Sequence, residues 1–91
     1  MALWKQIAPR YRSRPASLYF ELNNEPHDKL DAAAWNSVLA QGLAAVRESN
    51  PTRPVIIGPA SWNNLTALPK LVLPKDDQLI VTFHYYNPFE F

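Results

Sequence analysis

Helical spacing of apolar residues occurs in two stretches of the chain. The first stretch predicts a short helix over residues 2–12. The second is a longer apolar stripe over residues 30–46, and it predicts a helix whose N-cap is Asp28 or Asp31. Asn50-Pro51 stops this second helix, because a proline disfavours helical geometry at the residue before it.

Three other segments have the composition of β-strands. Residues 17–24 alternate, with apolar residues on one face and mostly polar residues on the other. Residues 55–57 are apolar throughout, as burial of both faces in a parallel sheet requires, and residues 79–83 are rich in β-formers. A short helix over residues 62–68 is expected between the last two strands. This alternation of strands and helices predicts an α/β fold with a parallel sheet.

An amide and a carboxyl group stand side by side where the first predicted strand ends. They belong to Asn24 and Glu25, and Pro26 follows them directly. Because proline has no N–H and biases Glu25 away from helical geometry, the chain must turn out of the sheet here. The carboxyl ends of parallel strands are where barrel enzymes present their catalytic groups. Glu25 is therefore the first candidate for a catalytic acid.

A second polar pair lies at the end of the last predicted strand. His84 and Tyr86 fall on one face there, and Trp62 follows the end of the middle strand. Because Glu25, His84 and Tyr86 each follow the last apolar residue of a strand, we expect them at the same end of the sheet. Trp62 can either stack on the flat face of a ligand or cover the rim of the fold, and its position in the sequence favours neither role.

Composition excludes several classes of function. Nine basic and eight acidic residues give a net charge of +1, so there is no electrostatic case for nucleic acid or an anionic membrane as partner. The chain has no cysteine, and its two histidines are far apart in sequence, so no metal-site pattern is visible. We expect neither a metal nor another cofactor.

The stretch from Leu18 to His27, which reads L-Y-F-E-L-N-N-E-P-H, resembles the signature of glycoside hydrolase family 5, the cellulase family. His84-Tyr-Tyr86 is similar to a His-x-Tyr motif at the end of that family's sixth barrel strand. Residues 53–64 look like its fifth strand and the loop that follows. The resemblance implies a partial TIM (β/α)8 barrel of about three βα units, covering barrel strands 4 to 6.

The resemblance also implies roles for individual residues in a retaining endo-β-1,4-glucanase. Glu25 corresponds to the general acid/base that protonates the leaving oxygen, and Asn24 to the amide that holds the nucleophile and the sugar 2-hydroxyl. Tyr86 is expected to donate to the nucleophile or the substrate, His84 to bind a hydroxyl near the cleavage point, and Trp62 to contact the sugar. The implied ligands are β-glucan and cello-oligosaccharides.

Length limits what the chain is expected to do alone. A barrel of this kind needs about 250 residues, whereas the chain has 91, so we interpret residues 1–91 as a single fragment of a catalytic barrel. The family's nucleophile glutamate ends its seventh strand, so we expect it to be absent and the fragment to be inactive alone. Two alternatives remain open: a carbohydrate-binding remnant, and a non-catalytic partial barrel that forms a homo-oligomer through its open sheet edges.

Overall fold

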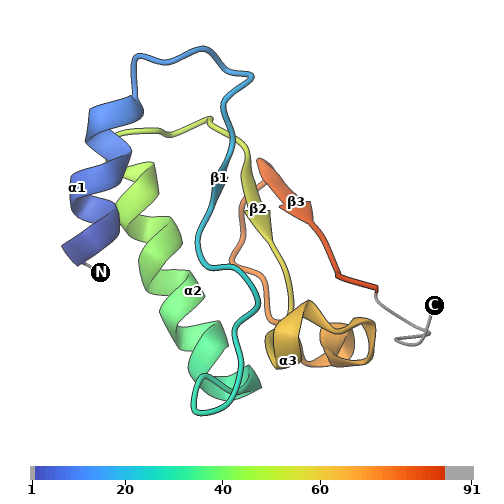
Figure 1. Ribbon diagram of the computed structural model, residues 1–91. Coiled ribbons are helices and arrows are strands. Elements are labelled where there is room, and N and C mark those ends of the chain that lie inside the picture. Colours follow the sequence, from blue (N-terminus) through green and yellow to red (C-terminus); the bar gives the residue numbers. More distant parts are fainter. Residues whose placement is uncertain (1, 86–91) are drawn as a thin grey trace.

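One parallel sheet with the strand order β1-β2-β3 organises the molecule (Figure 1). The computed structural model describes residues 2–85. The strands are β1 (Phe20–Glu21), β2 (Val55–Ile57) and β3 (Leu79–Val81), and β2 pairs in parallel with both of the others. The predicted α/β fold with a parallel sheet is therefore confirmed.

Two long helices precede and follow β1, and they lie side by side on one side of the sheet (Figure 1). Helix α1 (Ala2–Tyr11) matches the predicted stretch, and helix α2 (Ala32–Arg47) matches the second. Of the two candidate caps of α2, Asp31 takes the role, since its carboxylate accepts a hydrogen bond from the N–H of Ala34 at 3.0 Å. No helix in the described part of the chain is long and apolar enough to cross a membrane.

The prediction of one helix over residues 62–68 is wrong in detail. Two shorter elements take its place: α3 (Ala60–Asn63) and the 3-10 helix η1 (Leu65–Lys70). The reason is local, because three successive residues of α3 have left-handed backbone angles, with φ of 56° to 58° from Ser61 to Asn63. A right-handed helix cannot run through such residues, so it restarts after them.

The outer strands are shorter than the predicted spans of 17–24 and 79–83. Among the described residues each outer strand pairs only with β2, which is itself three residues long. A strand with one short neighbour can form only a few ladder hydrogen bonds, so only a few of its residues are in the sheet. The predicted alternation holds in part, since Phe20 and Leu22 are buried while Tyr19 is exposed, but Leu18, predicted on the apolar face, is exposed as well.

The core lies between the sheet and the two long helices. Trp4 of α1 stacks at a tilt on Phe20, with 5.2 Å between ring centroids, and its indole N–H donates to the carbonyl of Leu22 at 3.1 Å. Trp35 of α2 is 1% exposed and donates to the carbonyl of Gly58 at 2.8 Å. Each helix is thus tied by an indole hydrogen bond to the backbone just beyond a strand.

The guanidinium of Arg53, just before β2, is buried among main-chain carbonyls. It donates hydrogen bonds of 2.6–3.2 Å to five of them and a sixth, of 3.0 Å, to the side chain of Asn50. The five carbonyls belong to Tyr11, Arg12, Arg14, Pro15 and Leu18. These residues form the irregular connection from α1 to β1, so one side chain fixes the path of that connection.

A second arginine joins the end of α2 to the segment that enters β3. Arg47 binds Asp76 through two hydrogen bonds, Nε to Oδ2 at 2.7 Å and Nη2 to Oδ1 at 3.1 Å. The N–H of Gln78 also donates to Asp76, at 2.8 Å. The hydrogen bond from Arg47 has the largest effect on the pKa of Asp76 and lowers it. Burial opposes this with the next largest effect, and the bond from Gln78 and the charge of Arg47 lower the pKa further, so that the net shift is downward.

Because its pKa is lowered on folding, Asp76 stabilises the folded chain above the pKa of an unfolded aspartate, about 3.9, and this contribution is lost as the pH falls through the folded value. We predict that Asp76→Asn lowers the free energy of unfolding at neutral pH by about 2–3 kcal/mol, between the values for exposed and buried ion pairs. Urea denaturation at a series of pH values measures this.

The matched control is Asp77→Asn, since Asp77 is the neighbouring residue and is exposed. It should change stability little at any pH. If the difference in free energy of unfolding between Asp76→Asn and the natural chain stays constant down to strongly acidic pH, the lowered pKa of Asp76 does not stabilise the fold.

Candidate active site

The loop after β1 places Glu25 at the carboxyl end of the sheet. Glu25 has a φ of 49°, in the left-handed region, and Pro26 after it is buried. The carbonyl of Pro26 accepts a hydrogen bond of 3.0 Å from the N–H of Trp62. The loops that follow β1 and β2 are therefore joined at the residue after Glu25.

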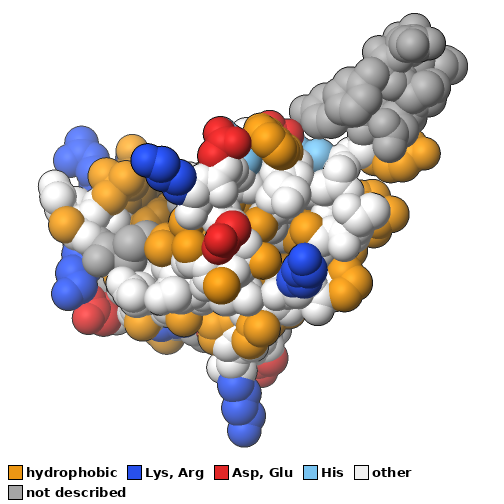
Figure 2. Space-filling view, turned by 90° about the horizontal axis from the view of Figure 1, so that it is seen from below, with side chains coloured by type: hydrophobic (Ala, Val, Ile, Leu, Met, Phe, Trp, Pro, Cys, Tyr) orange, Lys and Arg blue, Asp and Glu red, His pale blue; other side chains and the backbone are white. Residues whose placement is uncertain are grey.

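Glu25 and His84 are in contact across the sheet although they are 59 residues apart in sequence. The distance from His84 Nδ1 to Glu25 Oε2 is 2.7 Å, and both side chains are mostly buried, with exposed fractions of 27% and 21%. Figure 2 looks onto this end of the molecule and shows the histidine side chains beside acidic ones. A partly buried carboxyl group held by an imidazole is an arrangement suited to proton transfer.

Asn63 continues this row of side chains on the far side of the imidazole. Its Nδ2 lies 3.2 Å from His84 Nε2, and its carbonyl accepts a hydrogen bond of 2.8 Å from the N–H of His84. Asn63 is 0% exposed, and within the described part of the chain its Oδ1 has no hydrogen-bond partner. One residue therefore contacts His84 through both its backbone and its side chain.

Gly58, directly after β2, makes room for Asn63. A Cβ atom added to Gly58 would lie 2.7–2.8 Å from the three outer atoms of the Asn63 side chain, which is too close for any real contact. Only a glycine fits under this amide. The glycine after the middle strand was the one sign in the sequence that another side chain approaches the backbone there.

Trp62 lies at the edge of this row, 52% exposed. Its indole is stacked on the ring of His27, with 5.0 Å between centroids and 10° between the planes. His27 in turn donates from Nδ1 to the carbonyl of Glu25 at 2.6 Å. The flat face of Trp62 is therefore held in a fixed orientation by the same loop that carries Glu25.

The remaining predicted site residues have different outcomes. Asn24 is exposed beside Glu25, and Tyr86 lies outside the described residues. Asn64 is the N-cap of η1, and its side chain accepts from the N–H of Thr66 at 2.9 Å. Its neighbour Asn63 contacts His84, a contact that was not expected from the sequence. His27 was not singled out from the sequence, because nothing in its local pattern indicates a stack on Trp62.

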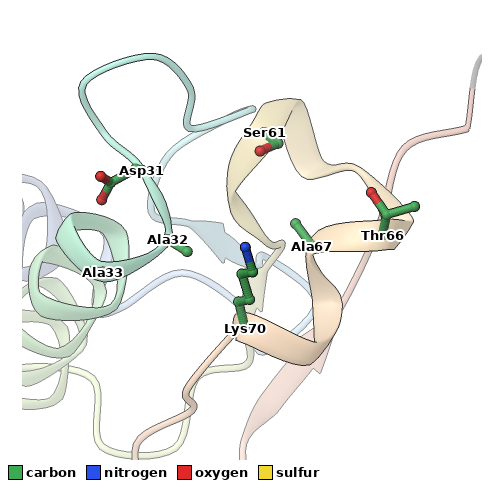
Figure 3. Close-up of a pocket in the computed structure, with 7 residues that line it drawn as sticks. All are labelled: Asp31, Ala32, Ala33, Ser61, Thr66, Ala67 and Lys70. Atoms are coloured by element: carbon green, nitrogen blue, oxygen red, sulfur yellow. The ribbon is translucent and has the colours of Figure 1, made fainter.

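A separate cavity of about 360 Å³ lies between the start of α2 and the elements α3 and η1 (Figure 3). The Lys70 side chain points into it, and Ser61 and Thr66 contribute hydroxyl groups. Glu25, Asn63 and His84 do not line this cavity. The described residues contain no group of three or more acidic, histidine or cysteine side chains that could hold a metal ion.

Comparison with known proteins gives consistent matches over the whole chain. The sequence model of one family, described as Cellulase (glycosyl hydrolase family 5), matches residues 1–91. Endoglucanase H of Acetivibrio thermocellus is 40% identical over 89 residues, which are 98% of this chain and 10% of that protein. The solved structure of endoglucanase Cel5A from Thermotoga maritima has a TM-score of 0.95 and is 49% identical, and it covers 99% of this chain and 29% of its own.

The chain thus spans less than a third of the length of these relatives. Structures of Cel5A in complex with cellobiose and with mannotriose match equally well, with TM-scores of 0.95 and 0.94.

We predict that Gly58→Ala destabilises the chain by about 1–3 kcal/mol, the usual effect of overpacking, because the new methyl group displaces the Asn63 side chain. Chemical denaturation measures the loss. The double variant Gly58→Ala with Asn63→Ala should be less destabilised than the sum of the two single variants, since the second change removes the atoms that clash. Additive losses would show that the two residues do not compete for space.

Proposed function

The chain belongs to the cellulase family, glycosyl hydrolase family 5, and we propose that it forms part of a retaining endo-β-1,4-glucanase in which Glu25 is the proton donor. The contact between Glu25 Oε2 and His84 Nδ1 supports this role most directly. It joins two side chains that follow different strands, at the end of a parallel sheet where catalytic groups of barrel enzymes lie.

The proposed chemistry needs a carboxyl group that changes protonation state during the reaction. Glu25 first gives its proton to the leaving glycosidic oxygen and then, as a carboxylate, removes a proton from the attacking water. The second carboxylate of a retaining enzyme lies about 5–5.5 Å from the first and attacks the anomeric carbon. In this proposal it comes from the part of the barrel that this segment does not contribute.

The substrate is proposed to be β-glucan or a cello-oligosaccharide. Trp62 offers an exposed indole face whose orientation the stack on His27 fixes, and such a face suits the apolar side of a pyranose ring. Asn24 and Tyr86 are proposed to bind the nucleophile and substrate hydroxyls. The cellobiose and mannotriose complexes of Cel5A are consistent with a β-linked sugar. The exposed Trp62 equally supports a second function, carbohydrate binding without hydrolysis.

The decisive experiment places this segment in a complete barrel. In a chimera, residues 1–91 replace the matching segment of Thermotoga maritima Cel5A, and hydrolysis of soluble β-glucan is measured. We predict that the chimera is active and that Glu25→Gln lowers kcat about 10²–10⁴-fold, the usual effect of losing a general acid/base. On an aryl cellobioside whose leaving group needs no proton, kcat/KM should fall much less, because it reports the step before water attacks, while kcat stays low because Glu25 no longer activates the water.

Glu48→Gln serves as the control, because Glu48 is an exposed carboxylate at the end of α2. An active chimera that tolerates Glu25→Gln would remove Glu25 from the proposed role. If the chimera binds cello-oligosaccharide but never hydrolyses it, and Trp62→Ala abolishes binding, the second function is the correct one.

We propose that the isolated chain self-associates through the edges of its sheet. Among the described residues β1 and β3 each pair only with β2, and the apolar side chains of Ile80, Val81 and Phe83 are 41–47% exposed. An unpaired apolar edge is a template for pairing with another chain. We predict a homodimer at micromolar concentration in sedimentation equilibrium, and a shift toward monomer on Val81→Lys. A natural chain that stays monomeric under these conditions would contradict this prediction.

A further inference from the structure

We propose that Asn63 is a positioning residue that selects the tautomer of neutral His84 in which Nδ1 carries the hydrogen, so that His84 donates to Glu25. Its consequence for catalysis rests on the proposed function, but the tautomer itself does not. The proposal concerns a residue that never contacts the reacting atoms and acts only through His84.

The two ring nitrogens of His84 face different partners at hydrogen-bonding distance. Nδ1 lies 2.7 Å from Glu25 Oε2, and Nε2 lies 3.2 Å from Asn63 Nδ2. An amide nitrogen can only donate, so Nε2 must accept and cannot carry a hydrogen. The hydrogen of a neutral ring is then on Nδ1, where an ionised Glu25 can accept it.

The orientation of the Asn63 amide is inferred by comparing which of its polar groups would lack a hydrogen-bond partner in each of the two possible orientations. Asn63 is fully buried, and its Oδ1 has no partner within the described part of the chain. If the amide were turned over, the oxygen would face His84 and both N–H groups would point to the unpaired position. In the observed orientation one N–H binds His84, so the carbonyl takes that position in place of one of the two N–H groups. Buried N–H groups without a partner are rarer than under-satisfied carbonyls, which favours the orientation with NH2 toward His84.

Asn63 is also fixed in place by its backbone and its surroundings. Its φ of 58° is a left-handed conformation that asparagine tolerates better than most residues. Its carbonyl accepts from the N–H of His84, and its amide lies directly on Gly58. The backbone bond fixes the position of Asn63 relative to His84, and the packing on Gly58 limits the room in which the amide can turn away from Nε2.

The inferred tautomer is the less common one for a histidine in water, and a hydrogen bond at one ring nitrogen decides which nitrogen carries the proton. Glu25 at Nδ1 and Asn63 at Nε2 both favour this tautomer of His84, so their contributions have to be separated. Glu25→Gln separates them, since a glutamine side chain can donate or accept and no longer imposes a choice. Asn63→Asp removes the donor and leaves a group of nearly the same shape that can only accept.

The test is the ¹⁵N spectrum of the histidine rings in the 91-residue chain, recorded at slightly alkaline pH, where imidazoles are neutral. We expect His84 to show a hydrogen on Nδ1 and none on Nε2, both in the natural chain and in Glu25→Gln. In Asn63→Asp a hydrogen should appear on Nε2. The ring of His27 is the internal reference, and its signals should not change.

A natural chain with a hydrogen on His84 Nε2 overturns the proposal. So does loss of the Nδ1–H form in Glu25→Gln, because Glu25 would then be the residue that selects it. If Asn63→Asp fails to fold, the natural chain and Glu25→Gln still decide the question. None of these spectra depends on hydrolysis, so an inactive chimera with the expected tautomer would refute the proposed function and leave this inference standing.

Discussion

The buried guanidinium of Arg53 is the interaction on which the placement of the first strand depends. β1 is only two residues long, and so short a ladder cannot by itself hold the chain in register. Arg53, just before β2, instead donates hydrogen bonds to five carbonyls of the segment that leads into β1. It also lies over the ring of Phe20, 5.3 Å from the ring centre. Arg53 thus helps to position β1 and the loop after it, which carries Glu25.

The opposite end of the sheet contains most of the backbone strain. Glu25 and the three residues from Ser61 to Asn63 all have positive φ, and such residues each cost on the order of 1–3 kcal/mol. They persist because several contacts determine them together: Trp62 donates to Pro26, and His84 donates to Asn63. Strain of this kind is usual at functional sites, where side chains must point in directions that relaxed loops do not provide.

Periodicity in the sequence was sufficient to predict the two long helices, the parallel sheet and the end of the sheet where Glu25 and His84 meet, because each depends on the spacing of neighbouring residues. The contacts of Asn63, His27 and Arg53 were not predictable in this way. Each joins segments that are distant in sequence, and an isolated asparagine or arginine has the same local pattern whether it faces solvent or a buried partner. The break at Ser61 was missed for the same reason, since nothing in its residue type requires a left-handed backbone.

The parallel topology also determines the order in which the structure can form. Every strand pair joins residues separated by an intervening helix, so an unfolded chain must close long loops before a single ladder bond appears. Helix α2 needs no such closure and can form from local contacts. The contact between Glu25 and His84 spans 59 residues and requires all three strands in place, which puts it among the last to form on folding and the first to be lost on partial unfolding.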